Sequence, residues 1–124
     1  MTRVLIVDDQ GSFRAHLRRL LTQAGLEVVG EAESIPEAEV QTQALHPDLA
    51  VVDIMLPETN GFEGTRRLRA LRPDLRVIIV SAFGNHAGIF QTAALAAGAE
   101  GYVLKDDLML SLVRAWAVRP SRCG

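Results

Sequence analysis

The sequence has very little of what redox, zinc or nucleic-acid sites are built from. Its 124 residues include one cysteine, Cys123, which cannot form an internal disulfide, a CxxC redox pair or a zinc cluster. The formal net charge is −2, so no basic field exists to attract a nucleic acid or an anionic membrane. No apolar run approaches the length of a membrane span, and the opening run at residues 4–7 is too short for a secretory signal. We therefore expect a cytoplasmic chain that binds neither nucleic acid nor membrane directly.

Lysine is as scarce as cysteine. Lysine and arginine together number 13, and Lys105 is the single lysine. A lone lysine in an arginine-rich chain indicates a position that needs a compact ammonium group and would not fit a planar guanidinium.

The length suits one domain, with an apolar fraction sufficient for a single core. We place the domain at residues 1–118 and expect residues 119–124 to be a tail or the start of a linker.

Apolar runs rich in β-branched residues predict five strands, at residues 3–7, 26–32, 49–52, 77–80 and 101–104. Each run is followed by a segment with helical spacing, and residues 86–97 and 108–116 are the last two of these helices. Proline, asparagine and glycine predict a loop at residues 56–61. Regular alternation of strand and helix predicts an α/β fold in which helices cover both faces of a parallel sheet. Right-handed crossovers leave few topologies, and we expect the flavodoxin-like doubly wound order 2-1-3-4-5.

Polar residues with chemical potential stand at the carboxyl ends of the predicted strands. In an open parallel sheet, ligands bind beyond these ends, close to the point where the strand order reverses. Each residue alone has an ordinary explanation as a turn, a helix cap or a solvated charge. Their occurrence together at the ends of the first, third, fourth and fifth strands predicts one pocket formed by Asp8, Asp9, Asp53, Ser81 and Lys105.

Three carboxylates in one pocket repel each other and would raise each other's pKa. A divalent cation relieves that repulsion, and hard oxygen ligands of this kind suit Mg²⁺, which also takes phosphate oxygens. Lys105 and the Ser81 hydroxyl would then supply a cation and a hydrogen-bond donor to a phosphoryl group. This combination favours attack of a carboxylate on phosphorus, which gives an aspartyl phosphate.

With these residues placed, nearly the whole chain, from about residue 3 to 116, resembles a response-regulator receiver domain of two-component signal transduction. The matching segments are specific when they are taken together, and any one alone would be weak. The segment at residues 98–102 is particularly similar to regulators with a DNA-binding helix-turn-helix output. The four matching segments read VLIVDDQ, DLAVVDIMLPETNGFE, VIIVSAF and GAEGYVLKDD.

The resemblance implies a role for each matching position around the metal. Asp53 would be the phosphoacceptor and Lys105 the cation that faces it. Asp9 would bind Mg²⁺ directly, with Asp8 as its acidic neighbour acting through water. Met55 would lend its backbone carbonyl to the metal.

The resemblance also implies a conformational switch and a partner. Ser81 would be the switch hydroxyl and Tyr102 the switch aromatic, with small Ala82 leaving room for the phosphoryl group. A sensor histidine kinase or a phosphotransfer protein would donate the phosphoryl group. Phosphorylation would then change the surface formed by residues 86–97, 101–104 and 108–116. In the family, the positions of Met55 and Phe83 overlook the path of attacking water, and neither side chain can orient water by hydrogen bonding, so we expect slow hydrolysis.

Several alternatives stay open at this stage. One alternative function is that of a magnesium-dependent phosphatase with an aspartate nucleophile, but such an enzyme would carry a second acid where this chain has Met55. Another is that of a flavodoxin relative, which would have a serine- and threonine-rich phosphate loop after the first strand. The chain could be a free-standing regulator or the N-terminal part of a transcription factor, and it could pair as a homodimer. We interpret the arginines of the region from 66 to 76 as a solvated face.

Overall fold

The computed structural model describes residues 1–84 and 88–118. Its centre is a parallel five-stranded sheet with the order β2-β1-β3-β6-β7. In chain order these strands are the first to fifth of the sheet, so the predicted order 2-1-3-4-5 is confirmed. Their bounds are β1 (Arg3–Val7), β2 (Glu27–Ala32), β3 (Leu49–Asp53), β6 (Arg76–Ser81) and β7 (Gly101–Leu104).

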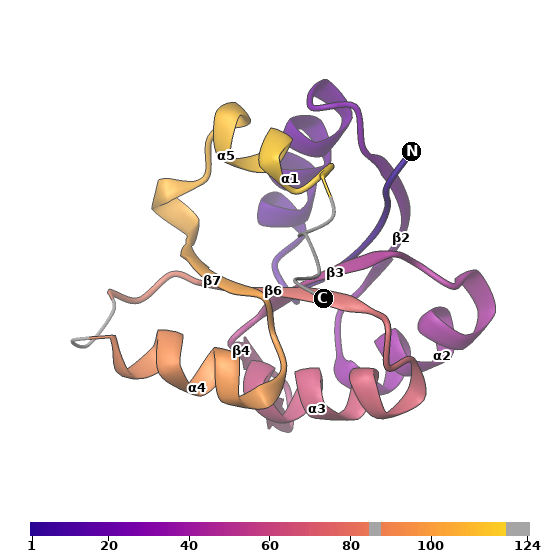
Figure 1. Cartoon of the computed structure of the whole chain (residues 1–124), viewed down its shortest axis with the longest axis vertical. Helices are drawn as coiled ribbons and strands as arrows, with labels where there is room; N and C mark the ends of the chain where they lie inside the picture. Colours follow the sequence, from indigo (N-terminus) through magenta and orange to yellow (C-terminus); the bar gives the residue numbers. More distant parts are fainter. Residues whose placement is uncertain (85–87, 119–124) are drawn as a thin grey trace, which may run out of the picture.

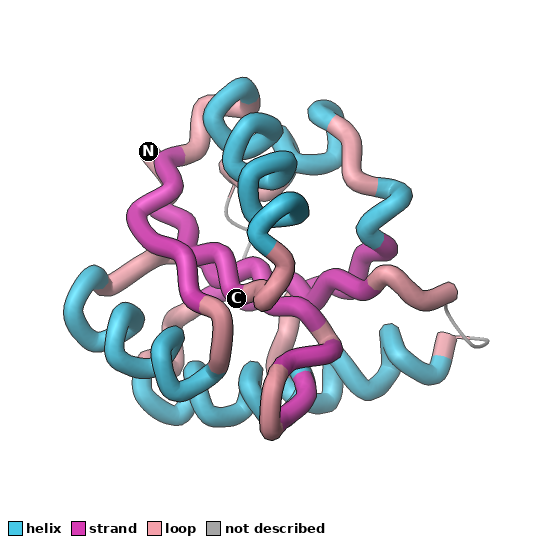
Figure 2. The backbone as a smooth tube through the Cα atoms, turned by 180° about the vertical axis from the view of Figure 1, so that it is seen from behind, coloured by secondary structure: helices cyan, strands magenta, loops and turns pink. Residues whose placement is uncertain are grey.

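Helices cover both faces of this sheet. Figure 1 shows α1 and α5 on one face and α2, α3 and α4 on the other, and the strands run between these two layers in Figure 2 as well. No helix within residues 1–84 and 88–118 is long and apolar enough to cross a bilayer. The helices are α1 (Gly11–Gln23), α2 (Ile35–Leu45), α3 (Gly61–Leu71), α4 (Ile89–Ala97) and α5 (Leu110–Ala115), with a 3₁₀ turn η1 (Lys105–Asp107) before α5.

The three central strands β1, β3 and β6 are buried on both faces, which explains their long apolar runs, whereas the edge strands β2 and β7 are half-buried. Side chains alternate along β1, so Leu5 and Val7 join one core with α2, α3 and α4, while Val4 and Ile6 join a second core with α1 and α5. Trp116 lies in the second core at 5% exposure. The sheet is therefore packed between two layers of helices.

Local signals fix several helix ends. Ser34 caps α2 by accepting a hydrogen bond from the backbone N–H of Glu37 at 3.3 Å, and Pro36 stands in the first turn. Gly98 ends α4 with a φ of 103°, a left-handed conformation that glycine adopts without steric cost. These are the start and stop that the sequence predicts.

Three segments differ from the prediction. The loop expected at residues 56–61 contains a small antiparallel hairpin, β4 (Met55–Leu56) and β5 (Thr59–Asn60). Within the described residues α4 begins at Ile89 after Gly88, and positions 86 and 87 of the predicted helix lie outside them. The final helix is shorter than predicted because the η1 turn and an extended Met109 precede it. The predicted tail at residues 119–124 lies outside the described part of the chain.

Candidate phosphoacceptor site

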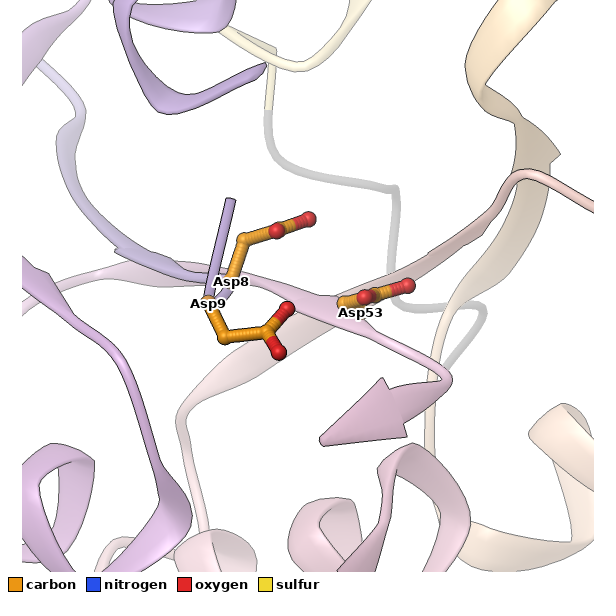
Figure 3. A group of neighbouring side chains, drawn as sticks. All are labelled: Asp8, Asp9 and Asp53. Carbon is orange, nitrogen blue, oxygen red and sulfur yellow. The ribbon is translucent and has the colours of Figure 1, made fainter. Parts of the chain in front are cut away.

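Three carboxylates converge beyond the ends of β1 and β3. These strands are neighbours in parallel register, with Val7 beside Val52, so the residues that follow them emerge side by side. Asp8 and Asp9 follow β1 directly, and Asp53 is the last residue of β3. One carboxylate oxygen from each of the three residues lies within 4.8 Å of the oxygens from the other two (Figure 3). The sheet topology thus gathers acids that are more than forty positions apart in the sequence.

The acids differ in their surroundings. Asp8 is fully buried and Asp53 is 5% exposed, while Asp9 is exposed to solvent. The backbone N–H of Gln10 donates to Asp8 Oδ1 at 2.8 Å. Asp8 Oδ2 lies 2.7 Å from the Lys105 ammonium, yet no hydrogen bond of good direction from the described residues reaches it. That oxygen keeps a lone pair available to a further partner.

Lys105 brings its positive charge into the acidic group. It follows the last residue of β7, and its Nζ lies 2.7 Å from Asp8 Oδ2 and 3.7 Å from Asp53 Oδ2. Gln10 Oε1 accepts from the same ammonium at 3.4 Å, and the ring of Phe13 lies beneath it, with 4.2 Å between Nζ and the ring centroid. One lysine therefore contacts two of the three acids.

The environment of Asp53 raises its pKa from 3.8 to about 6. Burial is the main cause because it disfavours the charged form, and the negative charge of Asp8 adds to it. Lys105 and the backbone N–H of Met55 act in the opposite direction. At Asp53 the effects of burial and of Asp8 thus outweigh the compensating charge of Lys105.

The site opens to solvent through a pocket of about 180 Å³. Asp53 and Ala82 both form part of its wall. Met55 and Phe83, both more than half exposed, stand at the pocket as the resemblance implies. The described residues that line the pocket are Asp9, Gln10, Asp53, Met55, Ala82, Phe83 and Lys105.

Ser81 and Tyr102 both hydrogen-bond to the backbone of Phe83, and neither is among the described residues that line the pocket. Ser81 is buried at the end of β6, and its Oγ accepts from the backbone N–H of Phe83 at 3.0 Å. The Tyr102 hydroxyl donates to the backbone carbonyl of the same Phe83 at 3.4 Å. The two residues expected to act as a switch are therefore joined through the backbone that follows β6.

The donor set fits Mg²⁺. Three carboxylate groups within 4.8 Å, one with an oxygen that lacks a hydrogen bond among the described residues, form the hard oxygen environment that this ion prefers. The sequence analysis missed two neighbours of the site, Gln10 and Phe13. Gln10 follows the acidic pair directly, so its proximity could have been expected, whereas no local sequence signal places Phe13, in the first turn of α1, beside Lys105.

Comparison with known proteins identifies the family. Residues 4–115 match the model of the response regulator receiver domain. The chain is 41% identical over 116 residues to the DNA-binding transcriptional activator DevR/DosR of Mycobacterium tuberculosis. This alignment covers 93% of the chain and 52% of that activator, so the chain spans about half the length of this relative.

Two further similarities agree. The chemotaxis protein CheY of Thermotoga maritima is 38% identical over 103 residues, which cover 83% of this chain and 84% of CheY. The crystal structure of a LuxR-family two-component response regulator from Aurantimonas sp. SI85-9A1 superposes with a TM-score of 0.85 at 35% identity, covering 94% of this chain and 84% of that one. The chain belongs to the response-regulator receiver domains, a family of signalling domains in two-component systems.

Proposed function

We propose that this domain accepts a phosphoryl group on Asp53 and uses it to switch the surface formed by α4, β7 and α5. The observation that carries the proposal is the buried Asp53 at the end of β3, facing an open pocket and flanked by two further acids and the only lysine. The donor is a phosphohistidine of a sensor histidine kinase or of a phosphotransfer protein.

The transfer needs few groups from the protein. An oxygen of the Asp53 carboxylate attacks phosphorus, the bond from phosphorus to the donor's imidazole nitrogen breaks, and that nitrogen keeps the electron pair. Lys105 lies between the two buried acids, where its charge offsets the negative charge on the phosphoryl oxygens. The domain catalyses only its own phosphorylation and slow dephosphorylation, and it does not turn over other substrates.

Asp8, Asp9, Asp53 and the backbone carbonyl of Met55 would hold Mg²⁺, which supplies positive charge to the phosphoryl oxygens when it is bound. Lys105 and the backbone N–H of Met55 favour the ionised form of the nucleophile, against the burial that raises its pKa. The N–H of Met55 bonds to the Asp53 carboxylate, and Gln10 fixes Asp8 through its backbone N–H. We expect that binding of a phosphoryl mimic such as beryllofluoride requires Mg²⁺.

The switch runs through the loop after β6. A phosphoryl group on Asp53 would draw the Ser81 hydroxyl away from the N–H of Phe83, and Tyr102 would lose its present partner, the carbonyl of the same residue. Tyr102 lies on β7 and its ring is 6.1 Å from that of Phe90 on α4, so its rotation would alter the packing of both elements. Turning such a switch from mostly off to mostly on needs roughly 5.5 kcal/mol of differential stabilisation.

Two relatives indicate what the output would be. The DNA-binding activator that matches over half its length favours a role as the N-terminal part of a transcription regulator, and the similarity to CheY favours a free-standing regulator. In either case the exchange takes place in the cytoplasm, and the switched surface contacts an output domain or a second copy of the chain.

The test uses a small donor. The purified protein and Asp53→Ala are incubated with Mg²⁺ and acetyl phosphate, and intact masses are taken. We expect one added phosphoryl group on the wild type and none on the variant. In a separate assay with a general phosphate ester, we expect no more than one turnover per protein molecule. If the wild type gained no mass even with a kinase present, the pocket would not be a phosphoacceptor, and sustained ester hydrolysis would favour a phosphatase.

A further inference from the structure

The ammonium of Lys105 rests on an aromatic ring. Its Nζ is 4.2 Å from the centroid of Phe13, a half-buried residue in the first turn of α1. Phe13 also packs against the core on the α1 and α5 side of the sheet. The ring therefore has a fixed position, with one part in the core and a face offered to the cation.

A ring face attracts a cation electrostatically, and the attraction grows when water is excluded. The Lys105 side chain is only 10% exposed, so its ammonium has few water molecules around it. Its polar neighbours among the described residues are Asp8, Asp53 and Gln10, and the closest of them, Asp8, is not the nucleophile. Lysine has a flexible stem, so a contact with the Phe13 ring adds to these polar contacts in limiting where its charge lies.

We propose that Phe13 is a positioning residue for phosphoryl transfer: its ring face holds the Lys105 ammonium between Asp8 and Asp53, where it can meet the phosphoryl oxygens. This inference rests on the proposed function. Core packing alone would be satisfied by leucine, which is apolar and of comparable size but has no ring face. Replacement of Phe13 by leucine therefore separates positioning from packing.

Lys105 is the only lysine, so the contact can be seen directly. Lysine labelled with ¹³C and ¹⁵N gives one set of side-chain NMR signals. We expect the methylene protons next to Nζ to be shifted upfield by the ring in the wild type and to return to ordinary values in Phe13→Leu. Identical shifts in the two proteins would overturn the contact on which the inference depends.

The kinetic test measures the initial rate of phosphorylation by acetyl phosphate at saturating Mg²⁺. Phe13→Leu should be slower by about threefold to tenfold, which is the range that a partly desolvated cation–π contact gives. Phe13→Trp should keep most of the rate because indole binds cations best. Phenylalanines with one, two and three ring fluorines at position 13 keep the shape and weaken the ring face, so the rate should fall in that order.

Leu20→Val is the matched control. Leu20 also lies on α1 and packs against the same core, whereas the ring that contacts Lys105 is that of Phe13. Free energies of unfolding are measured for both variants. An unchanged rate in Phe13→Leu, an equal loss in Leu20→Val, or no trend with fluorination would overturn the positioning role alone. A wild type that accepts no phosphoryl group would overturn the proposed function and the positioning role with it.

Discussion

Asp53 is an ionisable side chain that the fold places where ionisation is costly. Its pKa is raised to about 6, chiefly by burial and then by the charge of Asp8. In the folded state the carboxyl thus takes up a proton at a higher pH than in the unfolded chain, where its pKa is about 3.8. As the pH rises from about 4 to about 6, the unfolded chain loses this proton while the folded chain keeps it, so the free energy of unfolding falls. Above that range the full penalty of the buried, ionised carboxylate remains.

Replacing this carboxyl by an amide should remove that penalty. In the presence of a metal chelator, Asp53→Asn should raise the free energy of unfolding at pH 7 by about 1–2 kcal/mol, a value discounted for solvent screening at the open pocket. The gain should shrink as the pH is lowered towards 4, because the wild-type carboxyl is then neutral. Urea unfolding at several pH values measures both effects, and a gain that did not vary with pH would contradict the raised pKa.

On the proposed function, Met55 and Phe83 would set how easily water attacks the phosphorylated Asp53. Both side chains stand at the pocket and neither can orient water. We expect an aspartyl-phosphate half-life longer than minutes. Met55→Asn should shorten it by about tenfold, less than the 10²–10⁴-fold of a fully positioned general base. The decay of the phosphorylated mass measures this, with Met109→Asn, an exposed methionine away from the pocket lining, as the control. A wild-type half-life of seconds would contradict the expectation.

Among the elements, the start of α3 lies in close contact with the end of β3, which carries Asp53. Gly61 begins α3 directly against β3, and a Cβ on it would lie 2.6 Å from the backbone oxygen of Asp53 and 2.9 Å from the Cα of Ile54. Both atoms belong to the backbone, so they cannot move aside as a flexible side chain could. The spacing between α3 and β3 therefore depends on glycine at this position.

Gly61→Ala should push α3 away from the end of β3. We expect a loss of about 1–3 kcal/mol in the free energy of unfolding, typical of overpacking, together with slower phosphorylation. Gly84→Ala is the control, because Gly84 has a negative or extended φ and no atom within 4 Å of a built Cβ. Equal effects of the two substitutions on stability and rate would contradict this account.

The elements also show what the sequence can and cannot predict. Continuous apolar runs and strong caps such as Ser34 predicted the five strands of the sheet and the start of α2, because these signals are local. The two-residue strands β4 and β5 were missed because segments this short have no periodicity. The proximity of the three acids and Lys105 could be predicted, because the carboxyl ends of parallel strands lie at the same edge of the sheet. The contact of Phe13 with Lys105 could not be predicted, because it depends on side-chain packing.

At the scale of the whole molecule, Arg76 ties three distant segments together. Its guanidinium makes two hydrogen bonds to the carboxylate of Glu100, at 2.8 and 2.7 Å, and donates to the carbonyl of Trp116 at 2.9 Å. These contacts join the start of β6 to the turn before β7 and to the end of α5. The interpretation of the arginines as a solvated face is wrong for Arg76, which is 8% exposed, because tertiary partners give no local sequence signal.

Removing this guanidinium should be costly. Arg76→Met should lower the free energy of unfolding by about 3 kcal/mol, the low end for a broken buried ion pair, because Glu100 is partly solvated. Arg66→Met removes an ion pair with Glu63 in which both side chains are about half exposed, and it should change stability by less than about 1 kcal/mol. Chemical denaturation compares the two, and similar losses would contradict the role given to Arg76.

Chemical trapping shows which side chain carries the phosphoryl group. Borohydride reduces an acyl phosphate to an alcohol, so an aspartyl phosphate becomes homoserine. After treatment with acetyl phosphate and Mg²⁺, the account predicts homoserine at position 53 of the wild type and none in Asp53→Asn. Homoserine at Asp8 or Asp9, or a phosphoryl group that resists borohydride and maps to Ser81, would contradict it.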